Sequence, residues 1–497
     1  MTTKLDVLKS IEIGERVAEE EADSLERYFV ETDQWQQMRA GNIDVVYGPK
    51  GSGKSALYTL LNQKAGEFFD LGILLASAEN VRGATVFKAI IADPPPSELA
   101  FIYLWKLYSL TLIARTLREW EVKNDEANAL IQSLENAKLL PAGGTLATLF
   151  AAVRTYLTNW INRDAKSVEY ALTIDPTSGA PTLSRKKEFA EKSNDQNLGD
   201  IPVDDLLASA DVALAKAGLT IWVLFDRLDV AFAESLDLER NALRALFRAY
   251  SDIRAHSHIC LKIFVRDDIW RRITEGGFTE ASHITKAVHI TWTAESLLNL
   301  VVLRLTSNDS LNAYLLIDVN SVKADLNQQR ELFYRIAPDK VDTGRNPDTF
   351  DWIVIRTTDS TGNSVPREVI HLLDAAKDIQ IQRLERGGDE PENEILLERA
   401  AFKDALPQVS KVRYEQTLLA EHPDLLKHLQ ALEGEKCEHS NETLAKIWKV
   451  NLDDAALIAR RLIDVGFFEA RGTKEEPAYW VPFLYRAALS LVQGKAE

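Results

Sequence analysis

Three long apolar runs stand out along the chain, and each ends in polar residues. They are Ile43–Tyr47, Ile221–Phe225 with Asp226 to Asp229 behind it, and Ile259–Val265 with Arg266 behind it. Shorter runs at 71–76 and 287–290 have the same character. Continuous apolar runs are typical of strands buried on both faces of a parallel sheet. We therefore predict an α/β fold built on a parallel sheet.

Helical spacing of apolar residues dominates the stretches between these runs. Residues 15–30 have it together with an acidic face, which predicts a packing helix. Three helices are predicted at 98–121, 126–139 and 145–162, followed by a hairpin over 167–187 and a charged stretch at 185–200. We thus expect a large helical insertion, at about 80–200, between core strands. The expected domains are a helical lead-in (1–42), a core (43–292), a helical lid (293–405) and a last domain (406–497).

The last block has the pattern of a winged helix domain. Helices are predicted at 411–432, 442–448 and 453–464, and two strands at 466–472 and 478–482. Reading DNA would require a basic second helix, but 440–497 holds equal numbers of basic and acidic residues, and Asp453 and Asp454 begin that helix. This balance favours protein docking, while DNA binding stays open as the alternative.

The strongest chemical signal follows the first strand. The segment fits the phosphate-binding loop G-x-x-x-x-G-K-[ST], with a strand before it and a helix start after it. The glycines allow backbone amides to face phosphates, Lys54 is predicted to reach the β- and γ-phosphates, and Ser55 to hold Mg²⁺. The predicted nucleotide-binding residues of the loop are Gly48, Pro49, Lys50, Gly51, Ser52, Gly53, Lys54 and Ser55.

Acidic residues follow the second apolar run. Asp226 ends the strand at the edge where ligands bind in open α/β sheets, so we expect it to assist Mg²⁺ together with Ser55. Many NTP-hydrolysing proteins with this kind of loop carry a glutamate directly after this aspartate, and that glutamate activates water. This chain has Arg227 at that position. Asp229 is the nearest acid for that role. Slow hydrolysis is therefore expected.

Several arginines are candidates for phosphate contacts. Arg266 ends the third run and could sense the γ-phosphate, or it could pair with Asp267 or Asp268. Arg367 lies in the first turn of a predicted helix, where its charge is unfavourable unless it faces phosphate. A third set, Arg240, Arg244 and Arg248, shares one helix face. That face is predicted to be salt-bridged, with an arginine finger toward a neighbouring subunit as the alternative.

Composition and charge limit the partners and the cellular compartment that we expect for this protein. The chain has 497 residues, of which 46% are hydrophobic, and a net charge of −17. That charge argues against a surface that coats nucleic acid broadly. Two cysteines cannot form a disulfide framework, the first residues lack the apolar core of a signal peptide, and no run approaches a membrane span. We expect a cytoplasmic protein without membrane association.

Taken in order, GPKGSGKS, WVLFDRLD, KIFVRDDIW, SVPREVIHLL and the terminal winged-helix pattern resemble the STAND and origin-recognition-like branch of AAA+-related P-loop ATPases. Within it, they resemble bacterial ATPases found in anti-phage defence gene clusters. The resemblance implies ATP and Mg²⁺ as ligands, Asp226 as the magnesium-ligating acid, Arg266 as a sensor and Pro366-Arg367 as the lid motif. It also implies self-association and a separate protein effector, because no repeat-type sensor or effector domain is evident.

Three functions remain open from the sequence. The favoured one is a slow ATPase switch that assembles or gates a partner effector, in which Lys54, Asp226, Asp229 and Arg266 carry the chemistry. The second is a DNA-transaction ATPase loaded on DNA through the winged helix. The third is a scaffold that binds ATP without hydrolysing it.

Overall fold

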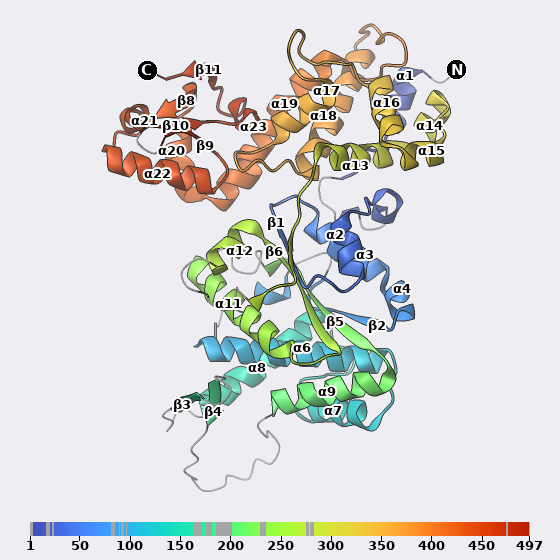
Figure 1. Ribbon diagram of the computed structural model, residues 1–497, viewed down its shortest axis with the longest axis vertical. Coiled ribbons are helices and arrows are strands. Elements are labelled where there is room, and N and C mark those ends of the chain that lie inside the picture. Colours follow the sequence, from blue (N-terminus) through green and yellow to red (C-terminus); the bar gives the residue numbers. More distant parts are fainter. Residues whose placement is uncertain are drawn as a thin grey trace. The chain divides into compact units, whose positions relative to one another are not determined.

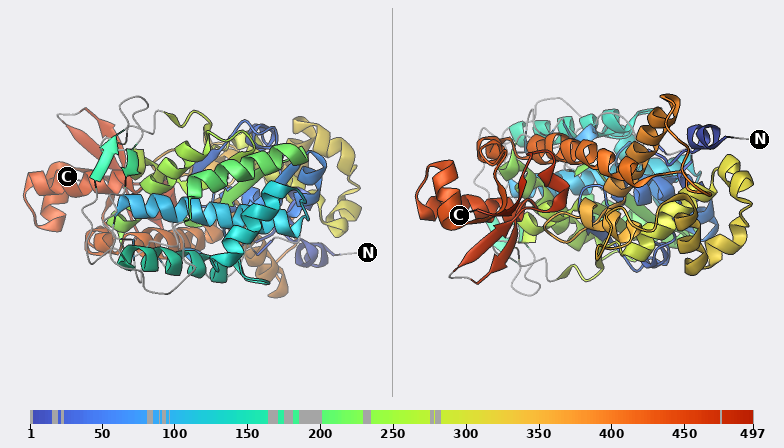
Figure 2. Two further views of the ribbon diagram at one scale, coloured as in Figure 1. Left: turned by 90° about the horizontal axis from the view of Figure 1, so that it is seen from below. Right: turned by 90° about the horizontal axis from the view of Figure 1, so that it is seen from above.

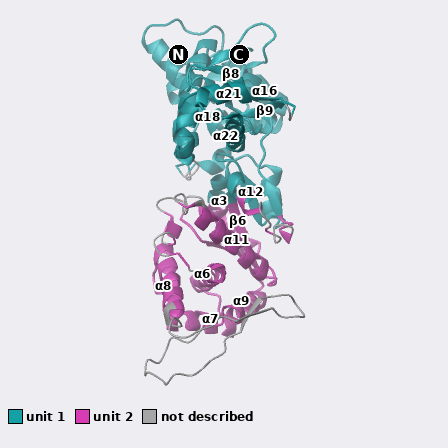
Figure 3. Cartoon of the chain, turned by 90° about the vertical axis from the view of Figure 1, so that its left-hand side faces the viewer, with its two compact units in different colours: residues 1–60, 265–270, 287–497 teal, residues 61–264, 271–286 magenta. Residues whose placement is uncertain are grey.

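The structure is a computed structural model of the whole chain. It describes residues 3–15, 20–21, 24–80, 85–88, 90, 94–95, 97–163, 171–174, 181–184, 201–228, 235–274, 278, 283–473 and 476–496. These residues form two compact units, which Figure 3 shows in different colours. Unit 1 comprises 1–60, 265–270 and 287–497, and unit 2 comprises 61–264 and 271–286.

A five-stranded parallel sheet of order β2-β5-β6-β1-β7 is the centre of the α/β fold (Figure 1). Its strands are β1 (Val45–Gly48), β2 (Ile73–Ser77), β5 (Thr220–Phe225), β6 (Ile259–Arg266) and β7 (Ala287–His289). The three apolar runs became β1, β5 and β6, and nearly all their side chains are buried. The predicted fold class is confirmed. None of the helices in the described ranges combines the length and apolar character needed to cross a membrane.

The helices of unit 2 pack as a layer around α6 (Glu98–Glu119), whose side chains are buried on most faces. Figures 1 and 2 show the helices running side by side. Edge-on aromatic contacts join Phe87, Trp105, Tyr108, Phe150 and Phe225, with ring centroids between 4.9 and 6.5 Å apart. The other elements are α4 (Ala65–Asp70), η2 (Val86–Lys88), α7 (Asp125–Asn136), α8 (Leu146–Arg163), β3 (Ala171–Ile174), β4 (Pro181–Ser184), α9 (Val203–Ala217) and α11 (Leu236–Ile253).

The predicted helices and hairpin between β2 and β5 are present in unit 2, and β3 pairs antiparallel with β4. The arginine face of α11 is ion-paired, as expected. Arg240 bonds Asp237 at 2.9 Å, and Arg248 bonds Glu98 at 2.8 Å. Arg244 instead donates to the Ile273 carbonyl at 3.3 Å.

Unit 1 contains the loop-bearing strand and a large helical block with its own apolar core. Its elements before β7 are α1 (Lys4–Ser10), η1 (Leu25–Tyr28), α2 (Asp33–Arg39), β1, most of α3 (Lys54–Gln63) and the first half of α12 (Asp267–Thr274). After β7 come α13 (Ala294–Thr306), α14 (Asp309–Leu315), α15 (Val319–Ala324), α16 (Leu326–Ile336), α17 (Thr349–Thr357), α18 (Pro366–Glu385) and α19 (Arg399–Arg413).

A four-stranded sheet of order β11-β8-β10-β9 closes the chain. It comprises β8 (Lys436–Ser440), β9 (Glu469–Gly472), β10 (Pro477–Trp480) and β11 (Val492–Lys495), together with α20 (Leu426–Gln430), α21 (Asn441–Trp448), α22 (Leu452–Asp464) and α23 (Phe483–Arg486). The two predicted helices and the antiparallel strand pair are present. Strands β8 and β11 were not predicted.

Two predicted helices differ from the structure. Over the described part of 15–30 there is only the 3-10 helix η1, because Glu21 is buried and forms an ion pair with Arg304 instead of facing solvent. The helix predicted at 411–432 begins at Arg399, turns into a π-helix at Tyr414–Leu419 (η4) and ends before Pro423. Proline lacks an amide hydrogen and restricts the preceding residue, so the helix ends there.

Candidate functional site

The predicted phosphate-binding loop joins β1 to α3 in unit 1. Gly51 and Gly53 have φ angles of +86° and +97°, a backbone conformation that glycine adopts without strain. The Lys54 ammonium donates hydrogen bonds to the carbonyls of Gly48 and Pro49, both at 2.8 Å. These bonds fold the lysine back over its own loop.

Two features of this loop are compatible with a bound phosphate group. The Ser52 hydroxyl is buried and has no hydrogen-bond partner among the described residues. A Cβ at Gly48 would lie 2.8 Å from that hydroxyl, so the backbone here must stay bare. Buried polar groups usually find a partner, and a phosphate oxygen would supply one. Ser55 lies half-buried in the first turn of α3, where a hydroxyl could serve Mg²⁺.

Trp292 supports the loop from outside. It follows β7, and its indole donates a hydrogen bond to the Ser52 carbonyl at 2.9 Å. This contact was not foreseen from the sequence, since nothing in the residues around Trp292 marks it. His289 of β7 pairs with Asp267 at 2.9 Å and packs beside the Tyr47 ring.

Arg367 lies directly against the loop. It is in the first turn of α18, and a Cβ at Gly51 would be 2.9 Å from the Arg367 Cβ. Val365 also borders Gly51. An arginine near a helix N-terminus opposes the helix dipole, so its place beside this loop agrees with a phosphate-facing role.

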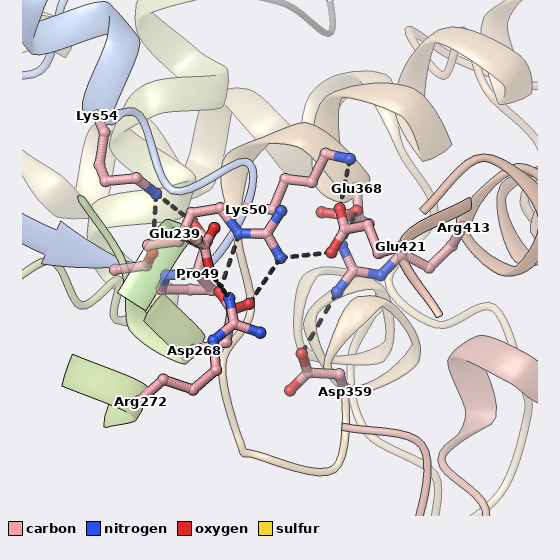
Figure 4. Close-up of polar contacts among 12 residues, drawn as sticks. Pro49, Lys50, Lys54, Glu239, Asp268, Arg272, Asp359, Glu368, Arg413 and Glu421 are labelled. Atoms are coloured by element: carbon pink, nitrogen blue, oxygen red, sulfur yellow. Dashed lines mark hydrogen bonds and ion pairs between the residues drawn. The ribbon is translucent and has the colours of Figure 1, made fainter. Parts of the chain in front are cut away.

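Arg266, at the end of β6, takes part in an ion cluster that includes the loop. Its guanidinium donates to both Asp268 carboxylate oxygens, at 2.9 and 3.2 Å, and to Glu421 at 2.5 Å. The other Glu421 oxygen accepts from Lys50 of the loop at 2.5 Å (Figure 4). The alternative in which Arg266 pairs with Asp268 is therefore present in the structure, whereas its role as a γ-phosphate sensor stays a prediction.

The electrostatics of Glu421 follow from this position. Burial alone would raise the pKa of its carboxyl, but the charges of Arg266 and Lys50 outweigh burial and lower the pKa to about 2. The carboxylate is therefore ionised at neutral pH and bound to two cations. No motif around Glu421 indicated this role, since it lies 371 residues from Lys50 along the chain.

Of the two acids predicted for metal and water, the structure describes Asp226, which lies in unit 2. Asp226 is buried just beyond the end of β5. Arg227 has a φ angle of +56°, and its guanidinium lies 3.5 Å from the Asn80 carbonyl. Asp229 lies outside the described residues. The structure therefore leaves the roles of Asp226 and Asp229 as predictions.

A second buried carboxylate was missed at this sheet edge. Ser77 pairs with Leu224 in the register of β2 and β5, so Glu79 and Asp226 both follow that pair by two residues. Glu79 accepts bonds from the Thr85 hydroxyl and the amides of Asn80 and Val86. Burial raises its pKa, even though these bonds and the charge of Arg227 lower it. These hydrogen bonds indicate that Glu79 stabilises the turn after β2.

The parallel sheet with its glycine-rich loop defines an α/β protein of the P-loop class. No model of a known protein family matches the chain, and no curated protein sequence matches it. Two solved structures of the Aeropyrum pernix ORC2 protein are similar over nearly the whole chain. The form with ADPNP and ADP is 13% identical, covers 95% of this chain and 94% of its own, and has a TM-score of 0.32. The ADP form is 11% identical, covers 93% and 88%, and has a TM-score of 0.31. Similarity this low says nothing about the site.

Proposed function

We propose that the protein is a Mg²⁺-dependent, ATP-binding switch that hydrolyses ATP slowly and controls a partner effector. The observation that carries the proposal is the set of cations around the loop of unit 1. Lys50 and Lys54 come from the loop itself, Arg266 from the end of β6 and Arg367 from the start of α18. Cations from three separate segments can report the phosphates of one nucleotide to distant parts of the chain.

Slow turnover is supported by the residue after Asp226. Arg227 is a cation where hydrolysing relatives carry an acid, and its guanidinium lies near the Asn80 carbonyl at 3.5 Å. A guanidinium cannot accept a proton from water. In this proposal Asp229 polarises water weakly, and Ser55 and Asp226 each keep the magnesium role predicted from the sequence. Asp229→Asn should slow single-turnover hydrolysis and leave ATP affinity unchanged.

The helix α22 supports a protein partner. Its exposed residues include Leu452 and Leu457, with Asp453 and Asp454 in the first turn. Apolar and acidic side chains on one surface suit a protein better than a phosphate backbone. The resemblance of the ordered motifs to ATPases of anti-phage gene clusters suggests that this partner is a defence effector, with self-association of the switch. DNA binding that weakens steeply with salt would instead favour the DNA-transaction function.

The nucleotide assignment is tested with Lys54→Ala. Isothermal titration calorimetry on the full chain should show Mg²⁺-dependent ATP binding that this variant abolishes, because Lys54 supplies a charge to the phosphates. Lys64→Ala is the matched control, since Lys64 lies ten residues on and pairs with the exposed Glu67. Full ATP affinity in Lys54→Ala would refute the proposed function.

A further inference from the structure

Glu421 is an oxyanion placed where the proposed function requires a phosphate. One carboxylate oxygen accepts from Lys50 and the other from Arg266, both at 2.5 Å. Its side chain is only 18% exposed. Carboxylates and phosphates accept the same charge-assisted hydrogen bonds from lysine and arginine. The two cations are thus already bound by an anion that belongs to the chain.

The backbone carries Glu421 to this position by an unusual route. It follows the π-helix η4, which continues α19. An inserted residue in a helix turns everything after it by about 100°, because an α-helix has 3.6 residues per turn. Pro423 then ends the helix two residues later. The π-helix therefore sets the direction in which Glu421 points.

The helix before η4 is fixed at its own end. Arg413 is buried and donates to Glu368 at 2.9 Å, and it lies 3.5 Å from Asp359 (Figure 4). Glu368 directly follows Arg367, which lies against Gly51 of the loop. One end of the segment 414–421 is thus anchored, Tyr414 and Leu418 within it are buried, and Glu421 at its other end is bound by Lys50 and Arg266.

We propose that Glu421 is an internal competitor for the terminal phosphate of ATP and makes the site distinguish ATP from ADP. This inference rests on the proposed function. The γ-phosphate and Glu421 compete for Lys50 and Arg266, so ATP displaces the carboxylate, whereas ADP leaves it bound. Displacement releases Glu421 and so loosens the end of the segment 414–421, which leads into the C-terminal sheet and helices.

The neighbour of Glu421 connects this exchange to α22. Burial lowers the pKa of the His422 imidazole, as does the charge of Arg461 in α22, while Glu421, Asp268 and Asp424 raise it. His422 therefore interacts electrostatically both with Glu421 and Asp268 of the ion cluster and with Arg461 of α22. Moving Glu421 changes the charges around His422, which interacts electrostatically with Arg461 of α22, the helix that we propose for partner docking.

The competition is tested by measuring ATP and ADP affinities of Glu421→Gln by calorimetry on the full chain. ATP should bind about tenfold more tightly, the factor that one charge-assisted hydrogen bond of modest strength corresponds to. ADP affinity should stay at the wild-type value. Glu415→Gln removes the same charge from an exposed position in η4 and should change neither affinity. Unchanged or weaker ATP binding, or an equal gain for ADP, would overturn the inference.

A measurement on the wild-type protein avoids any effect of substitution on folding. Amide hydrogen exchange of residues 411–425 should be faster with a non-hydrolysable ATP analogue than with ADP. Equal exchange with both nucleotides would overturn the inference. The two proposals fail differently: if the wild type binds no ATP, the proposed function fails, whereas ATP binding that depends on Lys54 but not on Glu421 removes only the competition.

Discussion

Two of the ion clusters in unit 1 have opposite designs. In one, the anion Glu421 bridges the cations Lys50 and Arg266. In the other, the cation Arg413 lies between the anions Glu368 and Asp359 and also contacts the Tyr485 hydroxyl at 3.4 Å. Arg413, Asp359 and Glu368 side chains are at most 10% exposed, whereas Lys50 is 33% exposed.

This difference in charge and burial indicates which cluster can exchange one of its members for a ligand. A phosphate can replace Glu421, because its partners are cations and one of them lies in the loop that is predicted to bind phosphate. Nothing comparable can replace Arg413, whose partners are buried anions that would be left uncompensated. We infer that the Arg413 cluster is a structural anchor and that the Glu421 cluster is the exchangeable contact.

The largest expected effect is at the anchor. Arg413→Met should lower the free energy of unfolding by about 3–5 kcal/mol, since it leaves two buried carboxylates without their cation. Denaturant unfolding followed by tryptophan fluorescence measures this loss. Lys411→Met is the control two residues away, because Lys411 is 68% exposed and lies 3.9 Å from Glu415. A similar loss in both variants would contradict the assignment of Arg413 as an anchor.

We expect the Glu421 cluster to make the free energy of unfolding depend on pH. The pKa of Glu421 is about 2 in the folded protein, below its ordinary value of 4.5. Its stabilising contribution, about 3 kcal/mol at 1.36 kcal/mol per pKa unit, is therefore complete above about pH 5 and is lost as the pH falls toward 2.

Unfolding free energies between pH 6 and pH 3 measure this dependence. Glu421→Gln should be less stable at pH 6 and should lose less stability on acidification than the wild type. Glu415→Gln should keep the wild-type dependence. If the unfolding free energies of Glu421→Gln and the wild type fall in parallel as the pH is lowered, the Glu421 cluster does not stabilise the segment 414–421.

A smaller effect is expected in the loop beside the exchangeable cluster. Gly51→Ala places a side chain at a φ angle of +86° and 2.9 Å from the Arg367 Cβ. The backbone strain is about 1–2 kcal/mol, and Arg367 must shift as well. Thermal unfolding should reveal the strain, and calorimetry should show weaker ATP binding. Gly66→Ala, in α4 with no atom within 4 Å of the added Cβ, is the control and should leave ATP affinity unchanged without lowering thermal stability.

The sequence predicted the sheet well because its signals are local. Strands β1, β5 and β6 are buried along nearly their whole length, so each is a continuous apolar run. The loop after β1 needs glycines at fixed spacing, and these are visible without any tertiary information. Arg367 was identified because an arginine in a first helical turn is unfavourable by itself.

What the sequence could not predict depends on distant partners. Glu21 belongs to an apparently acidic, solvent-facing helix until its partner Arg304 is known. Glu421 lies in a stretch with ordinary helical spacing, and only the π-helix and the approach of Lys50 and Arg266 give it a role. An ion pair between residues hundreds of positions apart leaves no pattern in one sequence.

The smallest expected effect concerns the uncharged support of the loop. Trp292→Phe keeps the ring but removes the indole donor to the Ser52 carbonyl. One neutral hydrogen bond contributes about 1 kcal/mol, so thermal stability should fall only slightly. If ionic contacts position the loop, ATP affinity should fall much less than in Lys54→Ala. Trp270→Phe, which alters a ring stacked on Tyr47 in the same unit, is the control. A loss of ATP binding in Trp292→Phe as large as in Lys54→Ala would shift the main support of the loop from the ions to this neutral bond.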